Sequence, residues 1–411
     1  MTEYSPEVLA LKQEFPDIGL KYLATLNPQE IEDIRARALA VESAAGVKDY
    51  RGKINSLIDQ GFGAMYVELF GQEFVDVLAP HHIEAIEWHW NSRLAFLRDE
   101  HPEYLAYFPI WSRGHMKSYC AERMVVVDAI LSYGADKPGY CLYIARNKDK
   151  VQEHIANVES ILGSERVKKL CPALSSPQRT EITNQQRRWT SSFLKTEANY
   201  AIQGGTLDSG LAGSRVEDTR PTYLTFDDVD SREDSPVIAE ARFRQLTTEV
   251  LPMRQSNTLV FFAQNLISRY SVMYRIHTGQ SRVLTNRKPT DPVPAVRNLI
   301  TEQRTVGGIV KDVFVSGEIT WQAWDARRVQ DEIDTEGLAS FERECNHLVE
   351  ASREGIILFN YNDDVHVISE SEFASVYGSV DAWLNWRKKP GNDRARTKTD
   401  KHANVAAWLT V

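Results

Sequence analysis

Trp111-Ser-Arg-Gly-His-Met-Lys-Ser118 is the stretch of the chain that says most about its function. An apolar run at 107–110 precedes it, and a segment with helical spacing at 119–132 follows it. A strand, a tight turn that ends in Lys-Ser and then a helix form the geometry of a phosphate-binding loop. Backbone N–H groups face the anion there, the Lys adds positive charge, and the Ser hydroxyl can bind Mg²⁺.

The loop departs from the usual G-x-x-x-x-G-K-[ST] pattern at two positions. Trp111 and Met116 stand where that pattern has glycine. Glycine there allows a left-handed backbone and a close approach to phosphate. Taken alone, the stretch therefore matches a nucleotide site only in part, and an ordinary turn is the alternative.

Composition bounds the class of protein. The 411 residues allow roughly two or three domains of about 150 residues each. A net charge of −9 gives no overall attraction to nucleic acid, so any DNA contact requires a local basic face. The four cysteines form no C-x-x-C pair, which argues against structural zinc and favours a reducing, intracellular setting. We expect neither a signal peptide nor an ordinary membrane span.

The spacing of apolar residues predicts helices first and then alternating strands and helices. The helices expected in a helical N-terminal region are 27–44 and 81–97, with His81 and His82 in a helix N-terminal turn. Short buried strands separated by helices imply a mainly parallel sheet with helices on both faces, whose ligands bind at the carboxyl ends of strands. The later elements are strands at 139–145, 223–226 and 258–263, a helix at 148–162, a polar loop at 278–294 and a helix from Asp325 through Phe341.

Two adjacent carboxylates end the apolar strand Tyr223-Leu-Thr-Phe-Asp-Asp228. Hydrolysis of ATP needs one carboxylate in the Mg²⁺ shell and another group that orients or deprotonates water. Because successive side chains leave a strand on different faces, Asp227 and Asp228 can divide these tasks. The alternative is a solvated turn in which an Asp caps the next helix.

The order of these motifs favours the first interpretation. Lys117 lies 110 residues before Asp227, and a third apolar strand then ends in Gln264-Asn265. A phosphate loop, a carboxylate strand and an amide-ended strand follow one another in a P-loop ATPase core. The Gln264 amide is then placed to sense the γ-phosphate, and a polar strand end without such a role is the alternative.

With these motifs, the chain resembles the large terminase subunit, the DNA-packaging motor of tailed bacteriophages. The phosphate loop of that family carries an arginine near its start, which 112–118 matches at Arg113, Lys117 and Ser118. Met116 departs from the glycine that usually stands there. The resemblance covers roughly residues 75–360, and its weaker segments are 78–82, 262–265, 316–321 and 341–345.

The resemblance implies a role for each residue of the site. Arg220-Pro221 leads into the acidic pair, in which Asp227 would take the Mg²⁺ and Asp228 would activate water, with Asp230 or Glu233 as rivals for the second role. The expected catalytic residues are Asp228, Arg113 and Lys117, and the expected metal ligands are Ser118 and Asp227. The expected nucleotide-binding residues are Ser112, Arg113, Gly114, His115, Met116, Lys117, Ser118 and Gln264.

The resemblance also implies a fold and a division into domains. It implies an α/β P-loop NTPase of the ASCE type, with a mainly parallel central sheet flanked by helices. The expected parts are a helical N-terminal region at 1–100, an ATPase motor domain at 101–360, and at 361–411 a linker with the start of an RNase H-like nuclease domain. Since a two-metal nuclease needs several carboxylates beyond this point, we expect no DNA cleavage by this chain.

The implied activity is hydrolysis of ATP with Mg²⁺, which moves viral double-stranded DNA into a procapsid. The implied partners are DNA, the portal protein, the small terminase subunit and further copies of the chain in a ring, in the host cytoplasm and without a membrane. Two other classes stay open: a structural or scaffolding relative with a degenerate ATP site, and an ATP-dependent DNA helicase. Arg215 is a candidate charge-stabilising arginine, and the basic segment 387–401 is either a phosphate contact or a linker.

Overall fold

The computed structural model describes residues 25, 49–178, 189–211, 215–231 and 233–349. The predicted helix at 27–44, the basic segment 387–401 and the nuclease start at 361–411 lie outside these residues. The strands are β1 (Ala106–Tyr107), β2 (Gly139–Ala145), β3 (Phe193–Lys195), β4 (Tyr200–Gly205), β5 (Tyr223–Asp227), β6 (Leu259–Ala263), β7 (Val296–Val306) and β8 (Ile309–Ile319). The helices are α4 (Tyr50–Gln60), α5 (Phe62–Phe70), α6 (Gln72–Asp76), α7 (Pro80–Leu97), α8 (Lys117–Gly134), α9 (Lys148–Leu162), α10 (Glu165–Leu170), α11 (Pro236–Gln245), α12 (Val272–His277), α13 (Ala326–Glu336) and α14 (Leu338–Glu344).

A mainly parallel six-stranded sheet forms the centre of the fold, in the order β1-β6-β5-β2-β4-β3. The pairs along β1, β6, β5, β2 and β4 are parallel, and only the edge strand β3 runs antiparallel to its neighbour. Ala145, Asp227 and Ala263 share one level of the register, so three strands end at the same edge. The predicted α/β class, with a mainly parallel sheet flanked by helices, is confirmed.

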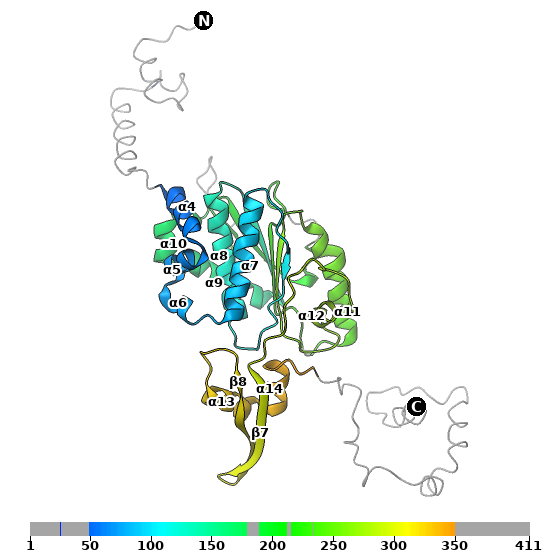
Figure 1. Ribbon diagram of the computed structural model, residues 1–411. Helices are drawn as coiled ribbons and strands as arrows, with labels where there is room; N and C mark the ends of the chain where they lie inside the picture. The colour runs from blue at the N-terminus through cyan, green and yellow to red at the C-terminus, as the bar shows by residue number, and fades with distance from the viewer. Residues whose placement is uncertain (1–24, 26–48, 179–188, 212–214, 232, 350–411) are drawn as a thin grey trace, which may run out of the picture. The chain divides into compact units, whose positions relative to one another are not determined.

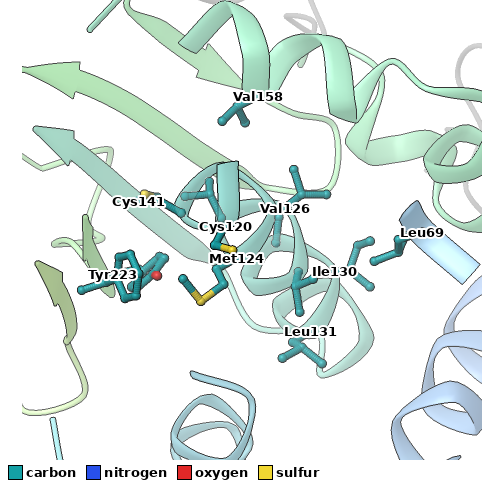
Figure 2. Packing of buried hydrophobic residues seen from close by; sticks show 14 of the residues in the cluster. Leu69, Cys120, Met124, Val126, Ile130, Leu131, Cys141, Val158 and Tyr223 are labelled. Carbon is teal, nitrogen blue, oxygen red and sulfur yellow. The ribbon is translucent and has the colours of Figure 1, made fainter. Parts of the chain in front are cut away.

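Both faces of the sheet are buried, which explains its continuous apolar strands. All seven residues of β2 are buried. Cys141 and Tyr143 pack with α7, α8 and α9, whereas Leu142 and Ile144 pack with α11 and α12 on the opposite face (Figure 1). In Figure 2, Cys141 and Tyr223 of the sheet lie beside Cys120 and Met124 of α8.

The helix ends follow local signals in the sequence. Pro80 occupies the first turn of α7, where its missing N–H costs nothing. The side chain of Asn147 caps α9 by accepting from the Lys150 N–H. The structure confirms the predicted helices at 81–97 and 148–162 and the predicted strand at 139–145.

The β7–β8 hairpin, α13 and α14 share a separate apolar cluster with Ala79. The Trp321 indole donates to the carbonyl of Val77 at 2.6 Å, which ties the hairpin to the chain just before α7. The single helix predicted from Asp325 through Phe341 is wrong. Gly337 has a φ of 82° and separates α13 from α14, because a left-handed backbone ends an α-helix.

In the part of the chain that the structure describes, no helix has the length and apolar character to cross a membrane.

Candidate functional site

The loop at 111–118 connects β1 to α8 and is anchored along one side. The Ser112 N–H donates to the carbonyl of Val293 at 2.9 Å, and the Arg113 N–H donates to the carbonyl of Glu344 at 3.1 Å. The Ser112 hydroxyl is also engaged, since it donates to the Arg113 carbonyl at 3.0 Å. Segments far away in sequence therefore fix the loop before any ligand arrives.

The other side of the loop presents unpaired N–H groups. Within the described residues, no acceptor is found for the N–H groups of Gly114 and Met116. The first-turn N–H groups of α8, beginning at Lys117, have no acceptor within the helix. Together with the positive end of the α8 dipole, this arrangement favours an anion.

Met116 adopts the backbone conformation that a glycine usually supplies. Its φ and ψ are 56° and 22°, a left-handed conformation that costs roughly 1–2 kcal/mol for a residue with a Cβ. Its side chain packs against two apolar clusters, which offsets the cost. Gly114 does need its small size: its φ is 79°, and a Cβ there would lie 3.1 Å from the Trp324 ring.

Lys117 is buried and turns back toward the start of the loop. Its ammonium group donates to the carbonyls of Trp111 at 3.0 Å and Ser112 at 3.1 Å. Burial lowers the pKa of Lys117, and the carboxylates of Asp228 and Asp227 act in the opposite direction. The charge is thus held at the loop with two carboxylates facing it.

The side chain of His115 points away from the cleft. It is fully buried, and its ring lies 5.6 Å from that of His81 and 5.3 Å from that of Trp324, measured between centroids. Burial first, and then neighbouring His81 and Lys117, lower the pKa of His115 to about 2, so the ring is neutral. The backbone of His115 is engaged as well, since its N–H donates to the carbonyl of Ser112 at 3.2 Å, so the prediction that His115 binds nucleotide finds no support in this geometry.

Arg113 is half-exposed and forms an ion pair with the last residue of α13. Its guanidinium lies 3.0 Å from the carboxylate of Glu336 near the end of α13. The side chain also lines the cleft, so it can exchange this partner for a bound anion.

At the end of β5, Asp227 is buried and held by one oxygen. The Tyr143 hydroxyl donates to Asp227 Oδ2 at 2.9 Å, and His154 Nε2 lies 3.5 Å from the same oxygen. Asp227 Oδ1 is buried and has no hydrogen-bond partner among the described residues. A buried carboxylate oxygen without a partner is costly unless a cation or a donor joins it.

Asp228 follows with an exposed side chain and a φ of 45°. Its carboxylate lines the cleft together with Asp227. The cleft walls around this solvent-exposed carboxyl raise its pKa, Lys117 acts in the opposite direction, and the charge of Asp227 adds to the rise. The two neighbouring acids therefore occupy different environments.

The rival acids Asp230 and Glu233 also line the cleft, but each is engaged by other protein groups. Both carboxylate oxygens of Asp230 accept backbone N–H groups at the start of α12, from Val272 and Met273, each at 3.0 Å. Burial raises the pKa of Asp230 to about 6, against the effect of these bonds. Gln264 accepts from the Asp230 N–H at 2.9 Å, and Glu233 forms an exposed ion pair with Arg146.

A cleft of about 1180 Å³ collects most of the predicted residues. Its lining excludes Ser112 and His115, and Arg215 is exposed outside it. The predicted residues that line it are Arg113, Gly114, Met116, Lys117, Ser118, Asp227, Asp228 and Gln264.

Sequence reasoning missed several polar residues of the cleft, although each had a signal. His154 lies on the apolar stripe of α9, which faces the sheet. Glu122 follows Ser118 by four residues, so these two side chains share one face of α8. Arg146 directly follows β2, at the sheet edge where ligands bind.

One end of the cleft is aromatic. The rings of Phe74 and Tyr119 lie 5.6 Å apart between centroids, and the Arg123 guanidinium stacks 3.1 Å from the Tyr119 centroid. Phe70, Phe74, Val77 and Tyr119 all line the cleft at this end. Such a surface suits a flat, uncharged ring.

The donor set fits a hard divalent cation. No group of three or more His, Cys, Asp or Glu side chains is arranged for a metal among the described residues. Mg²⁺ usually takes only one or two protein oxygens and completes its shell with water and phosphate. The unpartnered Asp227 Oδ1 and the Ser118 hydroxyl are oxygens of this kind in one cleft.

Comparisons with known proteins find similarity among solved structures. No protein-family model matches the chain, and no curated protein matches it. Among solved structures, the chain is similar to the large terminase of bacteriophage HK97, with 11% identity and a TM-score of 0.37. That alignment covers 66% of this chain and 50% of the terminase chain.

Proposed function

We propose that this chain is an Mg²⁺-dependent ATPase whose turnover moves double-stranded DNA. One observation carries the ATPase part: Lys117 and Ser118 at the start of α8 share a cleft with Asp227 and Asp228 at the end of β5. Transfer of a phosphoryl group to water requires N–H groups that donate hydrogen bonds to the phosphates, a charged amine and two acids in different environments.

The order of the strands supports this proposal. β6 lies between β1, which leads into the loop, and β5, which carries the acids. An inserted strand of this kind is what the predicted ASCE-type NTPase requires. The inserted strand ends in Gln264, whose side chain lines the cleft next to the acids.

In the proposed mechanism, each residue acts on a bound triphosphate or on water. The N–H groups of Gly114 and Met116 bind phosphate oxygens, and Lys117 offsets the charge that develops during in-line attack. Asp228 orients the attacking water and accepts its proton. Asp227 and Ser118 would hold Mg²⁺, which supplies charge neutralisation of the phosphates when bound.

Arg113 is the second cation of the loop. It leaves Glu336 and adds its charge to the γ-phosphate. Because Glu336 belongs to α13, this exchange would make the contacts of α13, and through it those of the β7–β8 hairpin, depend on the bound nucleotide. The aromatic end of the cleft would hold the base.

The DNA part of the proposal rests on the sequence resemblance to large terminases. The resemblance covers the loop arginine, the acidic pair and the amide-ended strand in the same order. The proposed substrate is therefore duplex DNA, moved by a ring of copies docked on a portal.

The first test measures nucleotide binding and turnover in single-residue variants. Lys117→Ala should weaken Mg-ATP binding by roughly 10–100-fold, because a charged hydrogen bond contributes about 1.5–3 kcal/mol. Asp228→Asn should retain binding but lose roughly 100-fold or more in turnover, since a general base contributes that much. Asp230→Asn should keep most of the turnover.

The matched control is Lys137→Ala, an exposed lysine paired with Asp99 outside the cleft. Failure of the parent chain to bind Mg-ATP at millimolar concentration would overturn the ATPase proposal and favour the scaffolding relative. Loss of turnover only in Asp230→Asn would reassign the acid that activates water.

A second measurement tests the DNA part. ATP-driven displacement of a third strand from duplex DNA is expected for a translocase, and the Asp228→Asn variant serves as the blank. Unwinding of forked DNA instead would favour the helicase.

A further inference from the structure

A buried group of three side chains lies beside Asp227 at the wall of the cleft and reaches one of its carboxylate oxygens. We call Glu122, Tyr143 and His154 the aspartate clamp. They come from α8, β2 and α9, so three elements converge on one carboxylate. None of them belongs to the phosphate loop or to the acidic strand.

The contacts of the clamp form a chain toward Asp227. His154 Nδ1 lies 2.9 Å from Glu122 Oε1, and because a carboxylate accepts, the imidazole donates there. This bond directs His154 Nε2 toward Asp227 Oδ2, 3.5 Å away. The His154 ring stacks on Tyr143 with centroids 4.9 Å apart, and the Tyr143 hydroxyl donates to the same oxygen.

Glu122 is itself fixed. Its Oε1 also accepts from the Asn157 side chain at 2.8 Å, one turn further along α9. Both Glu122 and His154 are more than nine-tenths buried. The imidazole therefore has little freedom to rotate, and its position is set by two helices.

The clamp acts on only one oxygen of Asp227. Both of its contacts reach Oδ2, and Oδ1 is left buried and without a partner. A network that served packing alone would be expected to satisfy both oxygens. The asymmetry leaves one defined oxygen for a ligand in the cleft.

We infer that His154, buttressed by Glu122, is a positioning residue that orients Asp227 so that Oδ1 receives the divalent cation. This inference rests on the proposed function, because it assumes that Asp227 binds Mg²⁺. Groups that orient a metal ligand from behind typically change metal affinity by about 10–100-fold when they are removed.

The test compares two amide replacements of His154 in the full chain. His154→Gln places an amide near the position of Nε2 and should still contact Asp227. His154→Asn is shorter, so it should keep the contact with Glu122 and lose the contact with Asp227. His101→Asn, at an exposed histidine that does not line the cleft, is the matched control.

The main readout is binding of Mn²⁺, as a probe for Mg²⁺, followed by electron paramagnetic resonance with saturating ADP. We expect His154→Asn to weaken Mn²⁺ binding by roughly 10-fold or more and His154→Gln to stay within about 3-fold of the parent. ADP binding in EDTA and the urea unfolding midpoint should be unchanged in both variants. With ATP, His154→Asn should lower kcat more than it changes KM.

The outcomes separate the two proposals. If the parent binds Mn²⁺ with ADP and His154→Asn binds it equally well, the positioning role is overturned and the ATPase proposal stands. If His154→Asn also loses ADP binding in EDTA, the residue is structural and the inference fails. If the parent itself binds no Mn²⁺ with ADP, both proposals fail together.

Discussion

Two buried aspartates, Asp128 and Asp227, lie on the same side of the central sheet in opposite situations. Both are almost fully inaccessible to solvent. Neither Oδ1 has a hydrogen-bond partner among the described residues, but Asp128 Oδ1 forms an ion pair with the Arg93 guanidinium 3.0 Å away, and Asp128 Oδ2 accepts from the Tyr200 hydroxyl at 2.6 Å. Asp227 has partners at Oδ2 only.

The difference follows from where each residue stands. Asp128 lies in the middle of α8, between α7 and the sheet, so the fold itself supplies its counter-charge. Burial alone would raise the pKa of Asp128, but Arg93, His89 and Tyr200 hold it below its ordinary value. Asp227 ends a strand at the cleft, where the remaining partner can come from a ligand. One buried charge thus serves stability, and the other is open to chemistry.

The largest effect is expected from removal of the counter-charge of Asp128. Arg93→Ala leaves a buried carboxylate without its guanidinium counter-charge, which typically costs about 3–5 kcal/mol in the free energy of unfolding. Urea unfolding followed by circular dichroism measures this loss. Arg98→Ala, at an exposed arginine just after α7, should change the same quantity by less than about 0.5 kcal/mol. A loss below about 1 kcal/mol in Arg93→Ala would show that the ion pair of Asp128 does not stabilise the fold.

The second prediction exchanges the two aspartates for asparagine. Asp227→Asn should keep the bond from Tyr143 and change unfolding by less than about 1 kcal/mol, while ATP turnover falls by roughly 100-fold or more. Asp128→Asn should instead destabilise the fold, since Arg93 then lacks its counter-ion. Unfolding free energy and ATP turnover are measured for both variants, and we expect Asp227→Asn to lose mainly turnover and Asp128→Asn mainly stability. If both variants lose the same amount of stability, the proposed difference between the two aspartates is wrong.

Much of the fold was predictable because the signals were local and repeated. The fully buried run at 139–145 and the apolar stripe of 148–162 each specify one element with its ends. It was also predictable that Lys117 and Asp227 lie close together, because parallel strands bring their carboxyl ends to one edge of the sheet. These inferences need only the period of the pattern and the rule for parallel sheets.

The partners of those residues were not predictable in the same way. Nothing in the sequence around Glu122 says that it faces His154, because that contact depends on how α8 packs against α9. The inward rotation of His115 depends on Trp321 and Trp324, about two hundred residues away. Gly337 was overlooked as a break because the apolar spacing continues through it to Phe341.

The smallest expected effect is the pH dependence of stability that comes from a buried histidine without a neighbouring carboxylate. His154 lies between Glu122 and Asp227, which raise its pKa against the effect of burial. His81 lies against His82 and His115 instead, and burial first, then His82 and Arg297, lower its pKa to about 3. The unfolded chain therefore binds a proton below about pH 6.5 that folded His81 cannot bind. This one proton should lower the free energy of unfolding by about 1.4 kcal/mol for each pH unit below that value.

His81→Phe removes this proton while keeping an aromatic ring against Trp111. Between about pH 7 and about pH 5, the parent should lose roughly 2 kcal/mol more unfolding free energy than His81→Phe. Urea unfolding at the two pH values gives the difference directly. Equal losses in the two proteins would mean that the His81 ring is protonated in the folded state, and that the fold supplies it with a counter-charge as it does for Asp128.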